Sequence, residues 1–515
     1  MGGRYVELRS QSAFSFLRAA ALPEDLVARA AALGLPAFAL ADRGGLSGAV
    51  RAWKAGCAAG VRVLVGAEVD LPGTAGALLL LATNSCSYRH LCRLLTLGHA
   101  RAGKHHCVVT LAEIEDNATD LICLAGGERG VLTAALRAGD EEGARARSSH
   151  LAGLFPGRLR VDLQRGRDAR IERRFRKLRD LAVAVGLPIV ATGDVRVAGP
   201  RESFLLDVLD SIRTGVPVAS LGRRSRLNLE SDFVDEREMA CRFHDLPEAL
   251  AESVAIAERC EFQIAGIGYR FPEVTLRAGV TPLARLRELT GEGARQRWGS
   301  PLPAAVQRQI EHELAVIGRL SLAGYFLVVE DIVRWCRGRG ILVQGRGSAA
   351  SSAVCYALGI TAVDPVRMGL LFERFLSLER SEWPDIDLDL PSGEQREAVI
   401  QYVYRRFGGE APGAELSAAG ARVAMTANVI TWRTRGALRE AARALGFPPL
   451  EVERLARRLA EEEGRAVTGA AVDLPRLVAA DPARAEPASP RLRQLARCVE
   501  GLRGLPRHLG QHEGR

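Results

Sequence analysis

A sequence pattern that occurs twice limits the folds that this chain can adopt. In both copies a helical pattern ends at Gly-Leu-Pro, an apolar run follows, and the run leads to an aspartate; the copies occupy residues 23–42 and 178–194. Glycine and proline end helices, and a short apolar run bounded by them is typical of a buried strand. Alternation of helix and strand predicts an α/β fold, either a parallel barrel or a doubly wound sheet.

Other apolar runs in the first domain also fit buried strands, at 61–65, 77–82, 120–124 and 159–163. In an α/β barrel, polar residues at the carboxyl ends of strands are the functional candidates. Asp42, Glu68 and Asp194 hold such positions. They are therefore the first candidates for a site in this domain.

Composition fits a globular protein. Of the 515 residues, 47% are hydrophobic and 25% are charged, which suits two to four domains. No apolar run is long enough to cross a bilayer, and the N-terminus lacks a signal-peptide pattern. We therefore expect a cytoplasmic protein without a membrane partner. The ten cysteines form no Cys-x-x-Cys pair, which argues against a zinc site.

The net charge of +9 favours a polyanionic partner. Nearly all of the positive charge is arginine, which suits bidentate phosphate contacts, but a genome biased toward arginine codons explains the composition equally well. A basic run at 165–179 is a candidate for nucleic-acid contact, and a solvated helix face with acidic partners is favoured there.

Residues 341–358 combine an apolar run, a Gly-rich turn and a helical pattern. Ile341–Val343 leads into Gln344–Ser348, small residues follow, and a helix is expected from Ala353. Glycine lets the backbone approach a ligand closely, and the first turn of a helix offers unpaired N–H groups to an anion. This stretch therefore predicts a phosphate-binding turn.

An acidic stretch, Trp383–Asp389, follows and carries aspartates at 385, 387 and 389. Strand alternation places all three on one face. Carboxylates so arranged repel each other unless cations lie between them, and Mg²⁺ prefers oxygen ligands together with substrate phosphates. Without its context the stretch would read as a solvated acidic turn. After a phosphate-binding turn, it is what two-metal phosphoryl or nucleotidyl transfer needs.

Four motifs in this order resemble the palm of a C-family bacterial DNA polymerase, the polymerase III α-subunit family: Gly345–Ser348, Ile360–Pro365, Leu371–Leu376 and Pro384–Asp389. Residues 344–356 are more similar to the error-prone branch than to the replicative one. The resemblance implies a DNA-directed DNA polymerase of damage tolerance, with primer–template DNA and deoxynucleoside triphosphates as partners. In a full-length protein it also implies accessory translesion proteins and a sliding clamp.

The resemblance implies roles for single residues. Asp385 and Asp387 are expected to be catalytic and to bind two Mg²⁺ ions. Asp389 is expected to support the site, and a surface carboxylate is the other interpretation. The residues expected to hold the nucleotide are Gly345, Arg346, Gly347, Ser348 and Arg374.

The first domain resembles the PHP domain of the same family. Active PHP domains bind metal through His-x-His, Asp-His, Glu and a late Asp-x-His. The matching positions here hold Arg9, Gln11, Asp42, Arg43, Glu68, Asp194 and Arg196. A guanidinium group has no lone pair to give to a metal. We therefore expect a metal-free scaffold in which arginines pair with Asp42, Glu68 and Asp194.

The resemblance also sets domain limits. We expect a PHP-like domain at 1–265, the first part of the palm at 270–415, a thumb-like helical insertion at 416–500, and the start of a second palm segment at 501–515. Within the thumb-like region, Arg433, Arg435 and Arg439 are candidates for contacts to the DNA backbone. An ordinary helix surface is an equally good interpretation of each.

The family pattern continues beyond His512 with a third catalytic carboxylate and a fingers domain. We therefore expect a truncated, frameshifted or split gene product that does not polymerise DNA by itself. One alternative is a fragment of a replicative α subunit, and another is a non-catalytic DNA- or partner-binding remnant. A PHP phosphoesterase is a third, which is disfavoured by the residues that replace metal ligands: Arg9, Gln11, Arg43 and Arg196.

Overall fold

The computed structural model describes residues 5–103, 106–166, 168–222, 230–267, 274, 276–377, 384–408, 423–465 and 490–511. The chain forms two compact units. The first unit joins Met1–Ile267 to Met425–Arg515, and the second is Gly268–Ala424. Trp383 of the acidic stretch and His512 lie outside the described residues.

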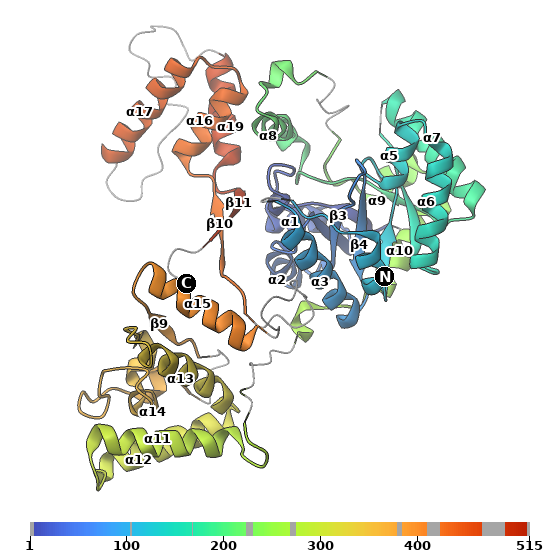
Figure 1. Cartoon of the computed structure of the whole chain (residues 1–515). Coiled ribbons are helices and arrows are strands. Elements are labelled where there is room, and N and C mark those ends of the chain that lie inside the picture. Colours follow the sequence, from blue (N-terminus) through green and yellow to red (C-terminus); the bar gives the residue numbers. More distant parts are fainter. Residues whose placement is uncertain are drawn as a thin grey trace. The chain divides into compact units, whose positions relative to one another are not determined.

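The first unit contains a seven-stranded sheet whose strands follow chain order (Figure 1). The strands are β1 (Glu7–Ser10), β2 (Ala37–Arg43), β3 (Arg62–Asp70), β4 (Ala77–Ala82), β5 (Leu121–Leu124), β6 (Leu159–Gln164) and β7 (Ile189–Thr192). A parallel bridge between Ser10 and Val195 brings the first and last strands together. The sheet is therefore a nearly closed barrel, and the predicted α/β class is confirmed.

One strand departs from a wholly parallel barrel. β4 runs antiparallel to both β3 and β5, whereas the other pairs of neighbours are parallel. Only residues 71–76 separate β3 from β4. A parallel crossover needs a dozen or more residues, so this short link forces the chain to turn back.

Helices alternate with most of these strands. They are α1 (Pro23–Ala32), α2 (Ala49–Ala59), α3 (Ser85–Arg101), α4 (Leu111–Asn117), α5 (Val131–Arg137), α6 (Glu141–Leu154), α7 (Ala169–Val185), α8 (Phe204–Thr214), α9 (Glu236–Arg242) and α10 (Pro247–Arg259). The repeated Gly-Leu-Pro has a clear reason: Gly34 and Gly186 have φ values of +70° and +68° just after α1 and α7. Only glycine adopts this left-handed backbone without strain, so each copy ends its helix before the next strand.

The second segment of this unit adds α16 (Thr434–Ala444), α17 (Pro449–Arg465) and α19 (Pro490–Leu502), with β10 (Ala427–Thr431) antiparallel to β11 (Pro506–Gln511). Its apolar side chains share a core with α8, where Leu205 and Leu209 lie in one buried cluster with Leu438 and Leu495. Helices α16, α17 and α19 therefore pack against α8 of the first segment within this unit. The predicted thumb and second palm segment remain predictions.

The second unit is mainly helical. It contains α11 (Pro282–Trp298), α12 (Ala304–Arg319), α13 (Ala323–Arg337), α14 (Ala353–Ala357) and α15 (Glu394–Phe407), with the short strands β8 (Gln344–Arg346) and β9 (Asp387–Asp389). Two 3-10 turns, η6 (Gly347–Ser351) and η7 (Phe372–Arg374), lie between the strands in sequence. One buried cluster joins α11, α12, α13 and α14.

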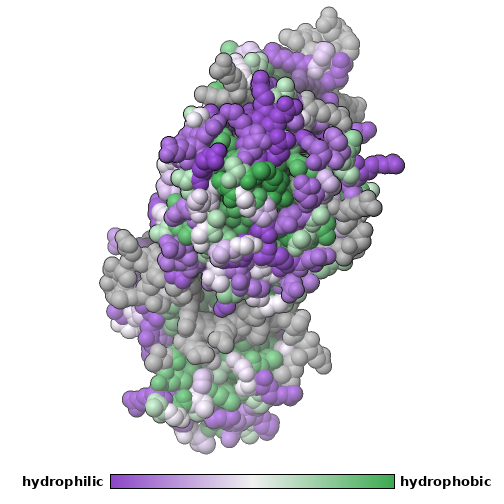
Figure 2. Space-filling view, turned by 90° about the vertical axis from the view of Figure 1, so that its right-hand side faces the viewer, coloured by the Kyte–Doolittle hydropathy of each residue, from purple (hydrophilic) through white to green (hydrophobic). Residues whose placement is uncertain are grey.

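The surface carries both hydrophilic and apolar areas (Figure 2). On the face in Figure 2, hydrophilic residues predominate around a central apolar area. Among the helices that the structure describes, none combines the length and the apolar character needed to cross a bilayer.

Candidate functional site

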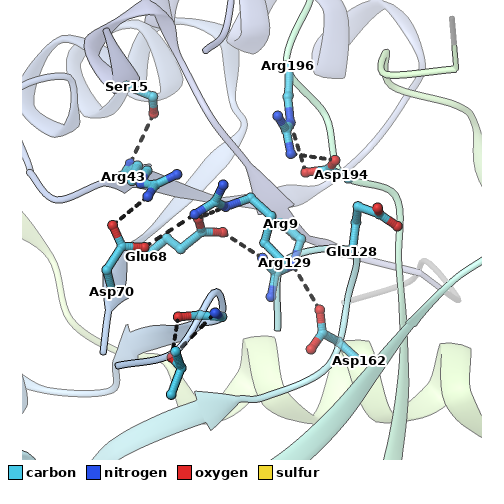
Figure 3. Close-up of polar contacts among 12 residues, drawn as sticks. Arg9, Ser15, Arg43, Glu68, Asp70, Glu128, Arg129, Asp162, Asp194 and Arg196 are labelled. Carbon is cyan, nitrogen blue, oxygen red and sulfur yellow. Dashed lines mark hydrogen bonds and ion pairs between the residues drawn. The ribbon is translucent and has the colours of Figure 1, made fainter. Parts of the chain in front are cut away.

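Arg9 lies at the centre of the barrel mouth and bridges three strands. It is 2% exposed, and its guanidinium donates to Glu68 Oε2 at 2.9 Å and to Asp162 Oδ2 at 2.8 Å (Figure 3). Burial alone would raise the pKa of Glu68, but the guanidinium groups of Arg9, Arg129 and Arg43 outweigh it and lower the pKa to about 2. Glu68 is therefore a carboxylate at neutral pH, already held by arginine.

Arg129 and Asp70 extend this network and were missed by the sequence analysis. Arg129 lies before α5 and binds Glu68 Oε1 at 2.9 Å and Asp70 Oδ1 at 3.2 Å. Arg43, at the end of β2, pairs with the other oxygen of Asp70. The position of Arg129 after β5 is a usable signal, because polar residues that follow barrel strands gather at this mouth.

Two of the expected pairings are present and one is wrong. Arg196 binds Asp194 at 2.8 Å, and Glu68 is bound by Arg9. Asp42 is instead held by hydroxyl and amide groups: Ser12 N, Ser12 Oγ and Ser15 Oγ all donate to it at 2.7 Å. Ser12 and Ser15 lie in the turn after β1, which covers the end of β2, so their groups bind the Asp42 carboxylate in place of an arginine.

Asp42 and Gln11 are also buried at this barrel mouth, and burial affects the pKa of Asp42. It raises the pKa of Asp42 to about 6, although the bonds from Ser15 and Ser12 lower it. The amide nitrogen of Gln11 is buried and has no hydrogen-bond partner in the described part of the chain. Within that same part, no group of three or more His, Cys, Asp or Glu side chains is placed to hold a metal ion. The carboxylates Asp42, Glu68 and Asp194 are each bound by protein donors.

The second unit brings the Gly-rich turn and the acidic stretch together. β8 pairs with β9 in antiparallel register, so that Arg346 lies opposite Asp387 and Gln344 lies opposite Asp389. Gly345 is required at the centre, because an added Cβ would lie 2.7 Å from the carbonyl oxygen of Ile360. Gly347 and Ser348 follow β8 directly and are exposed.

The acidic stretch alternates as a strand should. Ile386 and Leu388 pack against the core of the unit, while Asp385 and Asp389 are exposed and Asp387 is half-buried. The amide of Ile386 donates to the hydroxyl of Tyr325 at 3.0 Å, which anchors the stretch to α13. The aspartates therefore share the face away from the core.

The charges around this face are mixed. Arg346 Nε lies 3.2 Å from Asp389 Oδ1, with both side chains more than half exposed. Arg374 is exposed at the end of η7, which contacts η6. The structure thus places Arg346 opposite Asp387 in the strand pair and in an ion pair with Asp389, and Gly347 and Ser348 follow Arg346 in sequence.

The prediction that the first turn of the helix after the Gly-rich turn, α14, binds an anion is wrong. The first turn of α14 is capped by the buried carboxylate of Glu313, which accepts from the amides of Ala353 and Val354 at 2.9 and 3.0 Å. Ser352 Oγ donates to the same carboxylate at 2.7 Å. These groups are not free for a phosphate, and any phosphate contact from this stretch must come from the turn before it.

Arg433 and Arg435 are exposed at the start of α16. Arg439 differs, because its guanidinium binds Glu453 of α17 at 2.9 Å and its Nε is buried. Arg439 therefore joins two helices, while the other two face solvent.

Comparison with known proteins identifies two domain families in this chain. The family described as "Bacterial DNA polymerase III alpha NTPase domain" matches residues 284–515, and the PHP domain matches residues 7–166. The chain therefore carries a PHP domain and a bacterial DNA polymerase III alpha NTPase domain. Proteins named "Error-prone DNA polymerase" from Methylococcus capsulatus and Pseudomonas aeruginosa are each 40% identical over 99% of this chain. A third with that name, from Rhodopirellula baltica, is 36% identical over 99% of this chain.

The match covers less than half of each relative's own length. The chain covers 46% of the Methylococcus capsulatus and Pseudomonas aeruginosa proteins and 43% of the Rhodopirellula baltica protein. It spans about half the length of the curated relatives it matches, so the activity of those proteins does not pass to it without a test.

Proposed function

We propose that this chain is the part of an error-prone DNA polymerase that holds the first half of the nucleotidyl-transfer site. The observation that carries the proposal is the β8–β9 register, which sets Asp387 opposite Arg346 and beside Gly347 and Ser348. The similarity to this family suggests the reaction class that we propose, DNA-templated nucleotidyl transfer. The context that we propose for this activity is translesion synthesis in damage tolerance.

The carboxylates fit a magnesium site of the kind that substrate completes. Mg²⁺ in nucleotide sites is bound by one or two carboxylates, with water and substrate phosphates filling the other positions. Asp385 and Asp387 stand two residues apart on a stretch whose intervening side chain packs into the core. When bound, such ions lower the pKa of the primer hydroxyl and neutralise charge on the triphosphate.

The chain's own groups then position the nucleotide. Gly347 has φ +66° with open space around it, so its backbone is accessible to a phosphate. Ser348 supplies a hydroxyl, and Arg346 and Arg374 supply positive charge. In this arrangement Asp389 orients Arg346 through their ion pair.

The first unit serves as scaffold in this proposal. The PHP-like domain at 1–265 carries no metal, the palm occupies 270–415, and the helices within 416–500 lie against duplex DNA. Arg433 and Arg435 are exposed and available to backbone phosphates.

Primer extension tests the proposal. The polypeptide that contains this chain is assayed with Mg²⁺ on a primed template, as wild type and as Asp387→Asn. We expect the variant to lose incorporation by at least about 100-fold, because a catalytic carboxylate is removed. Asp389→Asn is the matched control, two residues away on the same face, and its loss should be much smaller. Extension by the wild type that Asp387→Asn leaves unchanged would refute the assignment.

DNA binding without catalysis is the second candidate function, and the same two proteins test it. If duplex DNA binds without any extension, and Asp387→Asn binds as well as wild type, the chain is a non-catalytic DNA-binding remnant.

A further inference from the structure

A pocket of about 450 Å³ opens at the barrel mouth, above the buried arginine–carboxylate network. Its charged wall residues come from five places in the first unit: Arg18 after η1 (Ala13–Ser15), Arg43 at the end of β2, Asp70 at the end of β3, Arg129 before α5 and Arg213 in α8. The turn Leu71–Ala75 and Val108 form the rest of the wall. We call this the arginine pocket.

The wall of the arginine pocket carries excess positive charge. Its single carboxylate, Asp70, is shared between Arg43 and Arg129 (Figure 3). Arg213 pairs with Asp210 at 2.6 Å on its own helix. Four guanidinium groups therefore face one cavity with one carboxylate between them.

Arg18 is the least compensated of these groups. Its guanidinium has no hydrogen bond or ion pair with any residue that the structure describes. One nitrogen of Arg43, Nη1, is buried and also lacks a hydrogen-bond partner there. The pKa of Arg18 is lowered to about 9, first by burial and then by the charges of Arg43, Arg129 and Arg213. An anion in the pocket would provide acceptors for the guanidinium of Arg18.

The size and convergence of the pocket favour a small ligand. Its volume is within the range of small-molecule sites, and duplex or single-stranded nucleic acid is more often bound along an extended basic groove. Guanidinium groups bind phosphate oxygens in pairs of parallel hydrogen bonds. Four guanidinium groups around one cavity suit two or more linked phosphates better than a single phosphate.

We infer that the arginine pocket binds a small polyphosphate anion, either inorganic pyrophosphate or the phosphate chain of a free nucleotide, and does so without a metal ion. The guanidinium groups take the place that cations hold in a metal-dependent phosphate site. The inference concerns binding alone and is independent of polymerase activity.

Calorimetric titration of the 515-residue chain with inorganic pyrophosphate, in buffer containing EDTA, tests this inference. We expect saturable binding at one site per chain, with pyrophosphate tighter than orthophosphate. Arg18→Gln should weaken binding about 10-fold or more, because a charge-assisted donor is lost, and Arg18→Lys should restore part of it. Removing Arg18 breaks no hydrogen bond or ion pair with any residue that the structure describes, so the fold should be retained.

Three controls make the result specific. Arg176→Gln, whose side chain is 65% exposed on α7, should bind as wild type does. Asp70→Asn should bind pyrophosphate more tightly, because it removes the only carboxylate of the wall. Asp387→Asn should leave binding unchanged, which separates this pocket from the proposed polymerase site.

A deoxynucleoside triphosphate titrated in parallel separates the two ligand sources. If it binds more tightly than pyrophosphate, the ligand is a nucleotide, and the reverse order assigns pyrophosphate; both support the inference. Absence of saturable binding at millimolar pyrophosphate would overturn it. Pyrophosphate binding that Arg18→Gln leaves intact would also overturn it. So would a site from which duplex DNA is displaced by neither pyrophosphate nor the nucleotide.

Discussion

Arg9 shows how one side chain sets the charge balance at the barrel mouth. Its guanidinium occupies the space between Glu68 and Asp162, both of which are almost fully buried. Two carboxylates so placed need a cation, and here the chain supplies one covalently. This fixed charge compensates the two buried carboxylates directly.

Arg9→Met tests this compensation. Removing the guanidinium leaves two buried carboxylates with too little positive charge, which should lower the free energy of unfolding by about 3–5 kcal/mol. Urea unfolding followed by circular dichroism measures the change. Arg176→Met is the control, because its pair with Glu172 is exposed and should contribute less than about 1 kcal/mol. Equal losses in the two variants would contradict the role given to Arg9.

Glu7 predicts a pH dependence of stability. Burial raises the pKa of this carboxyl from 4.5 to about 7, although bonds from Tyr5 and the Arg9 amide lower it. Because the folded state binds this proton more tightly than the unfolded chain, protonated Glu7 stabilises the fold. That contribution is complete below about pH 4.5 and is lost as the pH rises through 7.

We therefore expect Glu7→Gln to flatten the fall in stability between pH 4.5 and 7. Thermal unfolding across this range measures it, and the variant should gain most relative to wild type at the upper end. A parallel pair of curves would show that Glu7 does not titrate there.

At the scale of elements, the short helix α14 depends on another helix for its N-terminus. Glu313 of α12 accepts from three groups at the start of α14 and also from the amide of Gln309. Burial raises the pKa of Glu313, and the bonds from Val354, Gln309 and Ala353 lower it. This cap fixes the end of the Gly-rich turn, because Ser352 directly follows η6.

Glu313→Ala should destabilise the second unit by about 2–4 kcal/mol, because it leaves buried donors unpaired. Thermal unfolding and limited proteolysis of the second unit provide the measurement. Glu311→Ala is the matched control on the same helix, since Glu311 is 54% exposed and pairs with an exposed arginine. A variant at 313 that unfolds like the one at 311 would show that the cap contributes nothing.

Local patterns in the sequence predicted most elements, and contacts made by distant side chains limited the rest. The run 77–82 was expected as a strand and is β4, but its reversed direction was not visible, because all six of its residues are buried. A strand buried on both faces carries no alternation to reveal its neighbours. The pairing of Arg9 with Glu68 followed from chemistry at one barrel mouth. The partners of Asp42 and Glu313 depend on turns 30 and 39 residues away.

At the scale of the whole molecule, the first unit is built from two stretches that are far apart in sequence. Helix α8 supplies Leu205 and Leu209 to a core that is completed by α16, α17 and α19. Gly501 belongs to this contact, since an added Cβ there would lie 2.6 Å from Leu205 Cδ1. The barrel segment and the 425–511 segment are therefore expected to unfold together.

Leu495→Ala tests this coupling across almost 300 residues. Leu495 is fully buried in α19, so the truncation should cost about 2–5 kcal/mol. Because α8 shares its core, amides of 204–214 should lose protection in hydrogen–deuterium exchange, although the substitution lies in the other segment. Leu450→Ala, the same change at an 87% exposed position on α17, should leave α8 unaffected. If Leu495→Ala increased exchange only within 425–511, the two segments would not form one cooperative unit.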